Sequence, residues 1–107
     1  MPQPYLDTYT HALQLTADER ELWVTDCIND LVRVVSLPSL REVAQIRVGH
    51  LPHWFTMRPD GKVIFVSSWY SDVVSAIDVA TRKVLRNVQF ERATGPKRIL
   101  VAAKPAD

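Results

Sequence analysis

Two histidines at matching places in the sequence are the residues best suited to chemistry. His11 and His53 each stand at the start of a short apolar segment, and a neutral imidazole can ligate a metal ion or a cofactor. The alternative is an ordinary hydrogen-bonded histidine where a strand begins. His50 and His53 also have a His-x-x-His spacing, but two ligands on a proline-containing loop do not by themselves make a metal site.

Three aromatic residues could form a surface for a partner. Trp69 and Tyr70 are adjacent in a segment with turn character, so we expect both side chains to be exposed and available for contact. Trp54 follows His53 and is the weaker candidate. Packing against a neighbouring sheet is the more common role for a tryptophan in such an apolar segment.

The remaining reactive groups favour structural roles. Cys27 has no adjacent histidine or basic residue, so we interpret it as a small strand or turn residue rather than a reactive thiol. Lys97 and Arg98 could bind an anion, but a charged pair before a strand more often protects a sheet edge. No nucleophile stands beside a base, and there is neither a glycine-rich phosphate loop nor a catalytic carboxylate pair. The sequence therefore favours binding over catalysis for the isolated chain.

Charge and hydropathy argue against two classes of partner. The 107 residues include 13 basic and 12 acidic side chains, which are scattered and sum to a net charge of +1. This balance favours neither nucleic acid nor an anionic membrane surface. No apolar run approaches the ~20 residues of a membrane-spanning helix. The first residues lack the basic start and apolar stretch of a secretory signal, which leaves the compartment open.

An internal repeat organises the elements that must position these side chains. Residues 11–48 align without gaps onto residues 53–90, an offset of 42 residues. Many pairs preserve their character, and five are identical: His11/His53, Asp18/Asp60, Val24/Val66, Asp30/Asp72 and Val32/Val74. A period of about 40 to 45 residues built from short strands is typical of one blade of a β-propeller.

Each unit is expected to form a four-stranded antiparallel sheet. Runs rich in β-branched and aromatic residues indicate strands, and we expect them at 11–15, 21–25, 31–37 and 42–48, and again at 53–57, 62–67, 73–79 and 83–90. The first strand of each unit is mostly apolar on both faces, so it should lie near the centre, buried between neighbouring sheets. Asp30 and Asp72 are expected to cap their own turns with their carboxylates, as in an Asx turn.

The predicted organisation is therefore all-β and made of propeller blades. Residues 1–10 form an N-terminal extension, 11–48 the first blade and 53–90 the second. Residues 95–107 then begin a third blade, with its first strand at about 97–102, and end in a C-terminal tail.

The motifs within these units resemble the YVTN-type β-propeller repeat. Trp23-Val-Thr-Asp26 and Phe65-Val-Ser-Ser68 stand where the Tyr-Val-Thr-Asn tetrapeptide belongs. Arg58-Pro-Asp-Gly61 fits the Pro-Asp-Gly turn of the repeat, and Val74-Ser-Ala-Ile-Asp78 fits its third strand. The first unit departs from the pattern, with Thr16-Ala-Asp-Glu19 at the turn.

The resemblance implies the C-terminal part of a longer propeller, of a family whose members are often periplasmic or extracellular. Related propellers with haem, quinone or metal chemistry often place their site residues at the mouth of the central channel, where His11 and His53 should lie. Two blades cannot close a ring, so the expected partners are the remaining blades or further copies of the chain. We predict a binding or scaffold module, with a propeller enzyme or cofactor carrier as the alternative.

Overall fold

The computed structural model describes residues 10–90, which form two four-stranded antiparallel sheets and no helix. The all-β prediction is therefore confirmed. Sheet A and sheet B each keep the order of the chain. Sheet A contains β1 (Leu13–Leu15), β2 (Glu21–Asp26), β3 (Leu31–Ser36) and β4 (Arg41–Arg47), and sheet B contains β5 (Pro52–Met57), β6 (Val63–Ser68), β7 (Val73–Asp78) and β8 (Val84–Gln89). The predicted strand at 97–102, Lys97, Arg98 and residues 1–9 lie outside the described part.

The two sheets repeat each other in register as well as in order. Leu15 pairs with Leu22 in sheet A, and Met57 pairs with Ile64 in sheet B. A β-bulge follows Val34 in β3, and another follows Ala76 in β7, which is the position 42 residues later. The sequence repeat therefore corresponds to a repeat of backbone geometry that includes the bulge in the third strand of each sheet.

In both units, equivalent positions of the hairpin turns hold a residue in the left-handed backbone conformation. The backbone φ is 60° at Glu19 and 74° at Gly61, which occupy the same place in the two units. Asp30 and Asp72 form a second such pair, at 59° and 57°. The first unit therefore makes the same turn as the Pro-Asp-Gly sequence of the second, although it places a glutamate where glycine is favoured.

One packed interface joins the sheets. The front of sheet A, as we name the face turned toward sheet B, packs against the back of sheet B. The shared core takes Trp23, Val32, Val34 and Ile46 from the front of sheet A, and Phe55, Ile64, Val66 and Ile77 from the back of sheet B. Trp23 is fully buried, and its indole Nε1 donates a hydrogen bond to Glu21 Oε1 at 3.1 Å.

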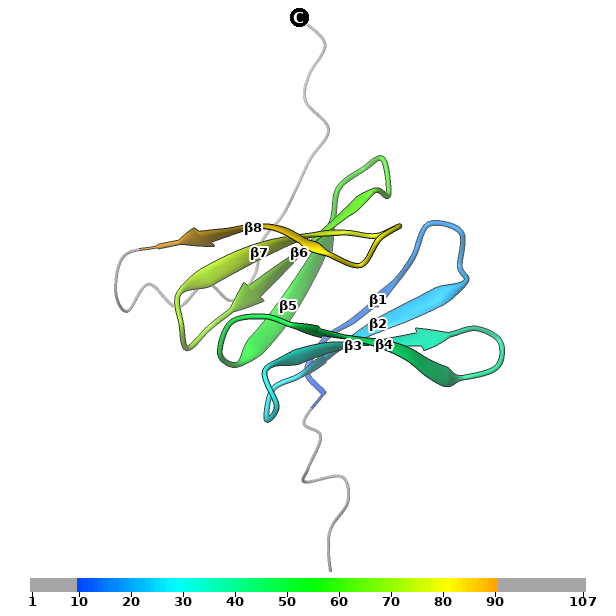
Figure 1. Ribbon diagram of the computed structural model, residues 1–107, viewed down its shortest axis with the longest axis horizontal. Coiled ribbons are helices and arrows are strands. Elements are labelled where there is room, and N and C mark those ends of the chain that lie inside the picture. Colours follow the sequence, from blue (N-terminus) through cyan, green and yellow to red (C-terminus); the bar gives the residue numbers. More distant parts are fainter. Residues whose placement is uncertain (1–9, 91–107) are drawn as a thin grey trace, which may run out of the picture.

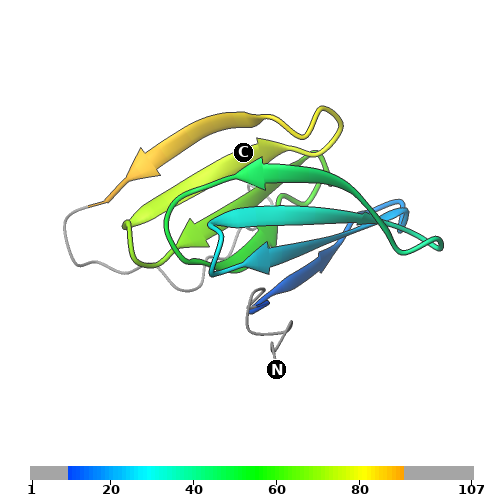
Figure 2. The ribbon, with the colours of Figure 1, turned by 60° about the horizontal axis from the view of Figure 1, so that its bottom comes forward.

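The inner strands β1 and β5 lie next to each other where the two sheets meet (Figure 1). Figure 2 shows the sheets as two twisted layers. The prediction that both first strands are buried is wrong for β1, because Leu13 is 61% exposed whereas Phe55 of β5 is 5% exposed. Sheet B covers only one face of β1, and Leu13 points away from it.

The turn after β2 corrects another expectation. Asp26, which was not singled out, caps this turn by accepting hydrogen bonds from the backbone amides of Ile28 and Asn29. The Asp30 carboxylate instead accepts a bond of 2.9 Å from the amide of Leu51 in the segment between the sheets. Asp30 thus ties sheet A to the start of sheet B.

Among residues 10–90, no helix is long and apolar enough to cross a membrane.

Candidate functional site

The predicted site residues gather at the end of the sheets where β1 and β5 begin. Here a cavity of about 390 Å³ is lined by a set that we call the mouth surface: His11, Cys27, Ile28, Leu51, His53 and Trp69. Most of these side chains are apolar or aromatic. The structure thus brings together three of the five residues that the sequence singled out, namely His11, His53 and Trp69.

Backbone hydrogen bonds hold the elements of the mouth surface in place. Thr25 Oγ1 accepts bonds from the amides of His11 and Ala12, at 3.2 and 3.0 Å, and so fixes the chain as it enters β1. In sheet B, the amide of Trp69 donates to the carbonyl oxygen of Leu51 at 3.0 Å. The turn that carries Trp69 is therefore tied to the segment that leads into β5.

The aromatic side chains form a continuous series, which we call the ring row. The imidazole centroids of His11 and His53 lie 3.6 Å apart, and that of His53 lies 6.1 Å from the centroid of Trp69. The row continues from Trp69 to Tyr70 at 6.3 Å and from Tyr70 to His50 at 5.3 Å. The last three distances are typical of interacting aromatic pairs, and the two imidazoles lie closer still.

The far end of the ring row is held by a carboxylate. His50 Nδ1 lies 2.9 Å from both Asp30 carboxylate oxygens. Tyr70 is 68% exposed, as was expected for a residue at the tip of a turn. The row therefore offers an aromatic surface that is open to solvent at Tyr70 and is held to sheet A at its His50 end.

Cys27 contributes a wall to the cavity. Its thiol is buried and donates to the carbonyl oxygen of Pro52, with 2.9 Å between Sγ and the oxygen. Burial is the main cause that raises the pKa of the Cys27 thiol above its ordinary value. A thiol held in the neutral form is a poor nucleophile, so this environment supports packing rather than covalent chemistry.

His11 and His53 are the two metal ligands that the sequence predicts. Within residues 10–90, no group of three or more His, Cys, Asp or Glu side chains is arranged to hold one. His50 and His53 have different ring partners, Tyr70 for the first and His11 for the second. A metal at His11 and His53 would need further ligands from outside the described chain, because zinc takes four.

Trp54 lies apart from the ring row. It packs half-buried against the core and lines a second cavity of about 310 Å³ together with His11, Leu13, Gln14 and other residues of β1 and β5. This cavity lies along the inner strands. His11 borders both cavities, so it links the mouth surface to the inner wall of the two sheets.

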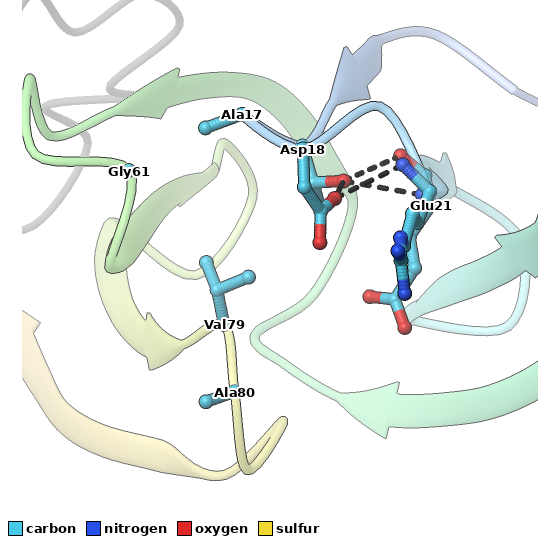
Figure 3. Close-up of a pocket in the computed structure, with 8 residues that line it drawn as sticks. Ala17, Asp18, Glu21, Gly61, Val79 and Ala80 are labelled. Carbon is cyan, nitrogen blue, oxygen red and sulfur yellow. Dashed lines mark hydrogen bonds between the residues drawn. The ribbon is translucent and has the colours of Figure 1, made fainter.

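A third cavity, of about 360 Å³, lies at the opposite end of β1 and was not predicted (Figure 3). In Figure 3, Asp18 and Glu21 lie on the sheet A side, opposite Gly61 and Val79 of sheet B. The Glu21 carboxylate forms an ion pair with Arg82, which joins the two sheets. Glu21 and Arg82 are 61 positions apart in the sequence, so no local sequence pattern could have indicated this ion pair.

The carboxylates of this third cavity serve the fold. Asp18 Oδ1 accepts bonds from the Arg20 amide and the Thr16 hydroxyl, at 3.0 and 2.8 Å. These bonds, with that from Arg20 the larger cause, hold the pKa of Asp18 below its ordinary value. Because Asp18 closes its own turn and Glu21 binds Arg82 and Trp23, we regard the mouth surface as the better candidate site.

Comparison with known proteins supports the fold. No protein-family model and no curated protein matches the sequence. The chain is similar in structure to Kuenenia stuttgartiensis hydrazine synthase, with 26% identity and a TM-score of 0.71 over 76% of this chain and 24% of that chain. It is also similar to virginiamycin B lyase from Staphylococcus aureus, with 12% identity and a TM-score of 0.75 over 94% of this chain and 33% of that one.

A third similar structure is the dihydro-haem d1 dehydrogenase NirN in complex with DHE. Its identity is 17% and its TM-score 0.71, over 87% of this chain and 21% of that chain. These neighbours are β-propeller proteins, and the chain spans between a fifth and a third of their length. The two sheets are therefore propeller blades that correspond to part of a ring.

Proposed function

We propose that this chain is a ligand-binding pair of β-propeller blades of the YVTN type, which works within a larger ring and binds its ligand at the mouth surface. The ring row carries this proposal. Five aromatic side chains from three segments of the chain converge on one end of the sheets, and the cavity beside them has the volume of a small-molecule site, which is roughly 300 to 1,000 Å³.

The side chains of the mouth surface favour a planar aromatic ligand. Ile28, which is 49% exposed, and Leu51 provide apolar walls, and Trp69 provides a face on which a second ring can stack. The imidazoles of His11 and His53 add polar groups that can orient such a ligand. An apolar cleft with a few polar groups is the usual composition of a small-molecule site.

Indole is a suitable probe for the test. We expect the amide signals of residues around the mouth surface to shift in two-dimensional NMR spectra as indole is added, and Trp69→Ala to weaken indole binding about fivefold. Leu85→Ser is the matched control, because Leu85 is exposed on β8 of the other edge of sheet B. Shifts confined to other surfaces, or an unchanged affinity of Trp69→Ala, would contradict the proposal.

A second candidate function is that of a cofactor carrier. It is favoured by the close approach of His11 and His53, whose rings come from different sheets and stack at 3.6 Å. NirN, a structural neighbour, is a dihydro-haem d1 dehydrogenase bound to DHE. In this chain two imidazoles would supply part of a ligand set, and the other blades of the ring would supply the rest.

Titration with hemin tests this second candidate. We expect the visible absorption band of hemin to shift on binding, and expect the double variant His11→Ala/His53→Ala to remove the shift. His50→Ala is the control, since His50 interacts with Asp30 and Tyr70. A spectrum that stays unchanged on adding the protein, or that shifts equally in all variants, would exclude the role of His11 and His53.

A further inference from the structure

The back of sheet A, the face turned away from sheet B, carries an apolar strip over β1, β2 and β3, beside the polar Arg33, Glu42 and Gln45. Cross-strand pairing places Leu13 beside Val24, Leu15 beside Leu22 and Leu22 beside Val35, so these five side chains share one face of the sheet. Leu13 is 61% and Leu15 39% exposed. Large apolar side chains gathered on an exposed sheet face are typical of an interaction surface.

The same face of sheet B is already used for packing. Leu13, Leu22, Val24 and Val35 correspond, 42 residues later, to Phe55, Ile64, Val66 and Ile77. All four of the latter are at most 5% exposed, because they pack against the front of sheet A. At these four positions the back of sheet A therefore has the residue types and the register of a blade-packing face whose counterpart in sheet B is covered by a blade.

On the front of sheet B, the outer strand is exposed at positions whose equivalents on the front of sheet A are covered. Val88 on this face is 42% exposed, whereas Ile46, its equivalent on the front of sheet A, is 6% exposed. Arg86 is exposed, and its equivalent is the half-buried Ala44. The outer part of this face is therefore open at the positions where sheet A is covered.

A pair of opposite charges distinguishes the two open faces from the interface between sheets A and B. At that interface, Ala44 of β4 and Val84 of β8 both pack against the core. Their equivalents on the open faces are Arg86 on the front of sheet B and Glu42 on the back of sheet A. If a second interface repeated the geometry of the first, a guanidinium and a carboxylate would take the places of two apolar side chains.

We propose that the back of sheet A is the docking surface for the front of sheet B of a second copy of this chain, with Arg86 of one copy facing Glu42 of the next. The larger ring that the proposed function requires then consists of copies of the chain. Each contact joins two different faces, so repeated contacts generate a ring when the rotation closes. Propellers have about four to eight blades, which corresponds to roughly two to four copies.

Sedimentation velocity on the full chain tests the proposal through charge reversal. The wild type should sediment as an oligomer, and Arg86→Glu should raise its dissociation constant at least about tenfold. Glu42→Arg should do the same, and the double variant Glu42→Arg/Arg86→Glu should restore association. The restoration is essential, because Glu42 also binds Arg33 within its own sheet at 2.7 Å, and loss of that ion pair alone would not be corrected by Arg86→Glu.

Lys62→Glu is the matched control. Lys62 is exposed on the turn between β5 and β6, so the same reversal of charge there should leave association unchanged. A wild type that is monomeric at all concentrations overturns the proposal, as does an oligomer that is indifferent to Arg86→Glu or that the double variant fails to restore. Indole binding reports on the ligand site separately, because it is measured by shifts at the mouth surface.

Discussion

Sheets A and B have the same strand order and register but different surroundings. The front of sheet A and the back of sheet B bury each other, while the back of sheet A and the outer part of the front of sheet B are exposed. Thus Val24 is half-buried where its equivalent Val66 is fully buried. The comparison teaches that the sequence repeat specifies the strand order and register of each blade. The burial of a side chain depends instead on whether another sheet covers its face of the blade.

The largest expected difference between the sheets concerns the two aromatic residues at the centre of β2 and β6. Trp23 is fully buried between the sheets, whereas its equivalent Phe65 is half-buried on the front of sheet B. We expect Trp23→Ala to lower the free energy of unfolding by about 3 to 5 kcal/mol, and Phe65→Ala to lower it by about half as much. Urea denaturation at dilute protein concentration measures both, and equal losses would refute the comparison.

A smaller difference between the sheets is expected in how their stability depends on pH. Asp26 of sheet A is a titratable residue, whereas its equivalent in sheet B is Ser68. Burial by itself raises the pKa of Asp26, but hydrogen bonds from Asn29 and Arg33 outweigh burial and hold the pKa below its ordinary value. The stabilisation is therefore complete above the unfolded-state pKa of about 3.9 and is lost as the pH falls through the lower folded-state value.

The variant Asp26→Asn checks this pH dependence. We expect its free energy of unfolding to be lower than that of the wild type at neutral pH, and the difference to shrink as the pH falls below about 4. Asp60→Asn is the control, because Asp60 lies on an exposed turn, where its pKa is lowered mainly by Arg58. If the difference in the free energy of unfolding between wild type and Asp26→Asn stayed constant from neutral to acid pH, Asp26 would not be the source of the pH dependence.

The smallest expected effects lie at the equivalent turn positions Glu19 and Gly61. An added Cβ at Gly61, where φ is +74°, would lie 2.8 Å from Ala17 Cβ, so Gly61→Ala should destabilise the fold by about 1 to 2 kcal/mol. Glu19→Gly should stabilise it by about 0.5 kcal/mol, since relief of the left-handed strain exceeds the added freedom of the unfolded chain. Thermal unfolding of both variants measures the effects, and a shared sign would disprove the equivalence of the turns.

Most of the fold could be predicted from the sequence because its signals are local. The strands follow from β-branched and aromatic runs, and the 42-residue offset aligns them. An Asx turn follows the third strand of sheet B, since Asp78 accepts bonds of 2.8 Å from the amide and the hydroxyl of Thr81. Each of these features involves residues close together in the chain.

The features that could not be predicted join residues far apart. The ion pair between Glu21 and Arg82 crosses from one sheet to the other. The stacking of His11 on His53 depends on how closely β1 and β5 approach, which the repeat alone does not specify. Asp26 caps its turn although the sequence pattern favours Asp30, which recurs as Asp72. Its role requires the position of the turn amides, which only the structure provides.

Hydroxyl-radical footprinting of the protein in its native assembly tests most directly whether the chain is a part of a ring with an open binding end. We expect the oxidation rates of Leu13 and Leu15 to fall as the protein concentration rises. Over the same range, Trp69 and Tyr70 at the mouth should remain reactive. Oxidation of Leu13 and Leu15 at the same high rate at every concentration would contradict this arrangement, and so would protection of Trp69 and Tyr70.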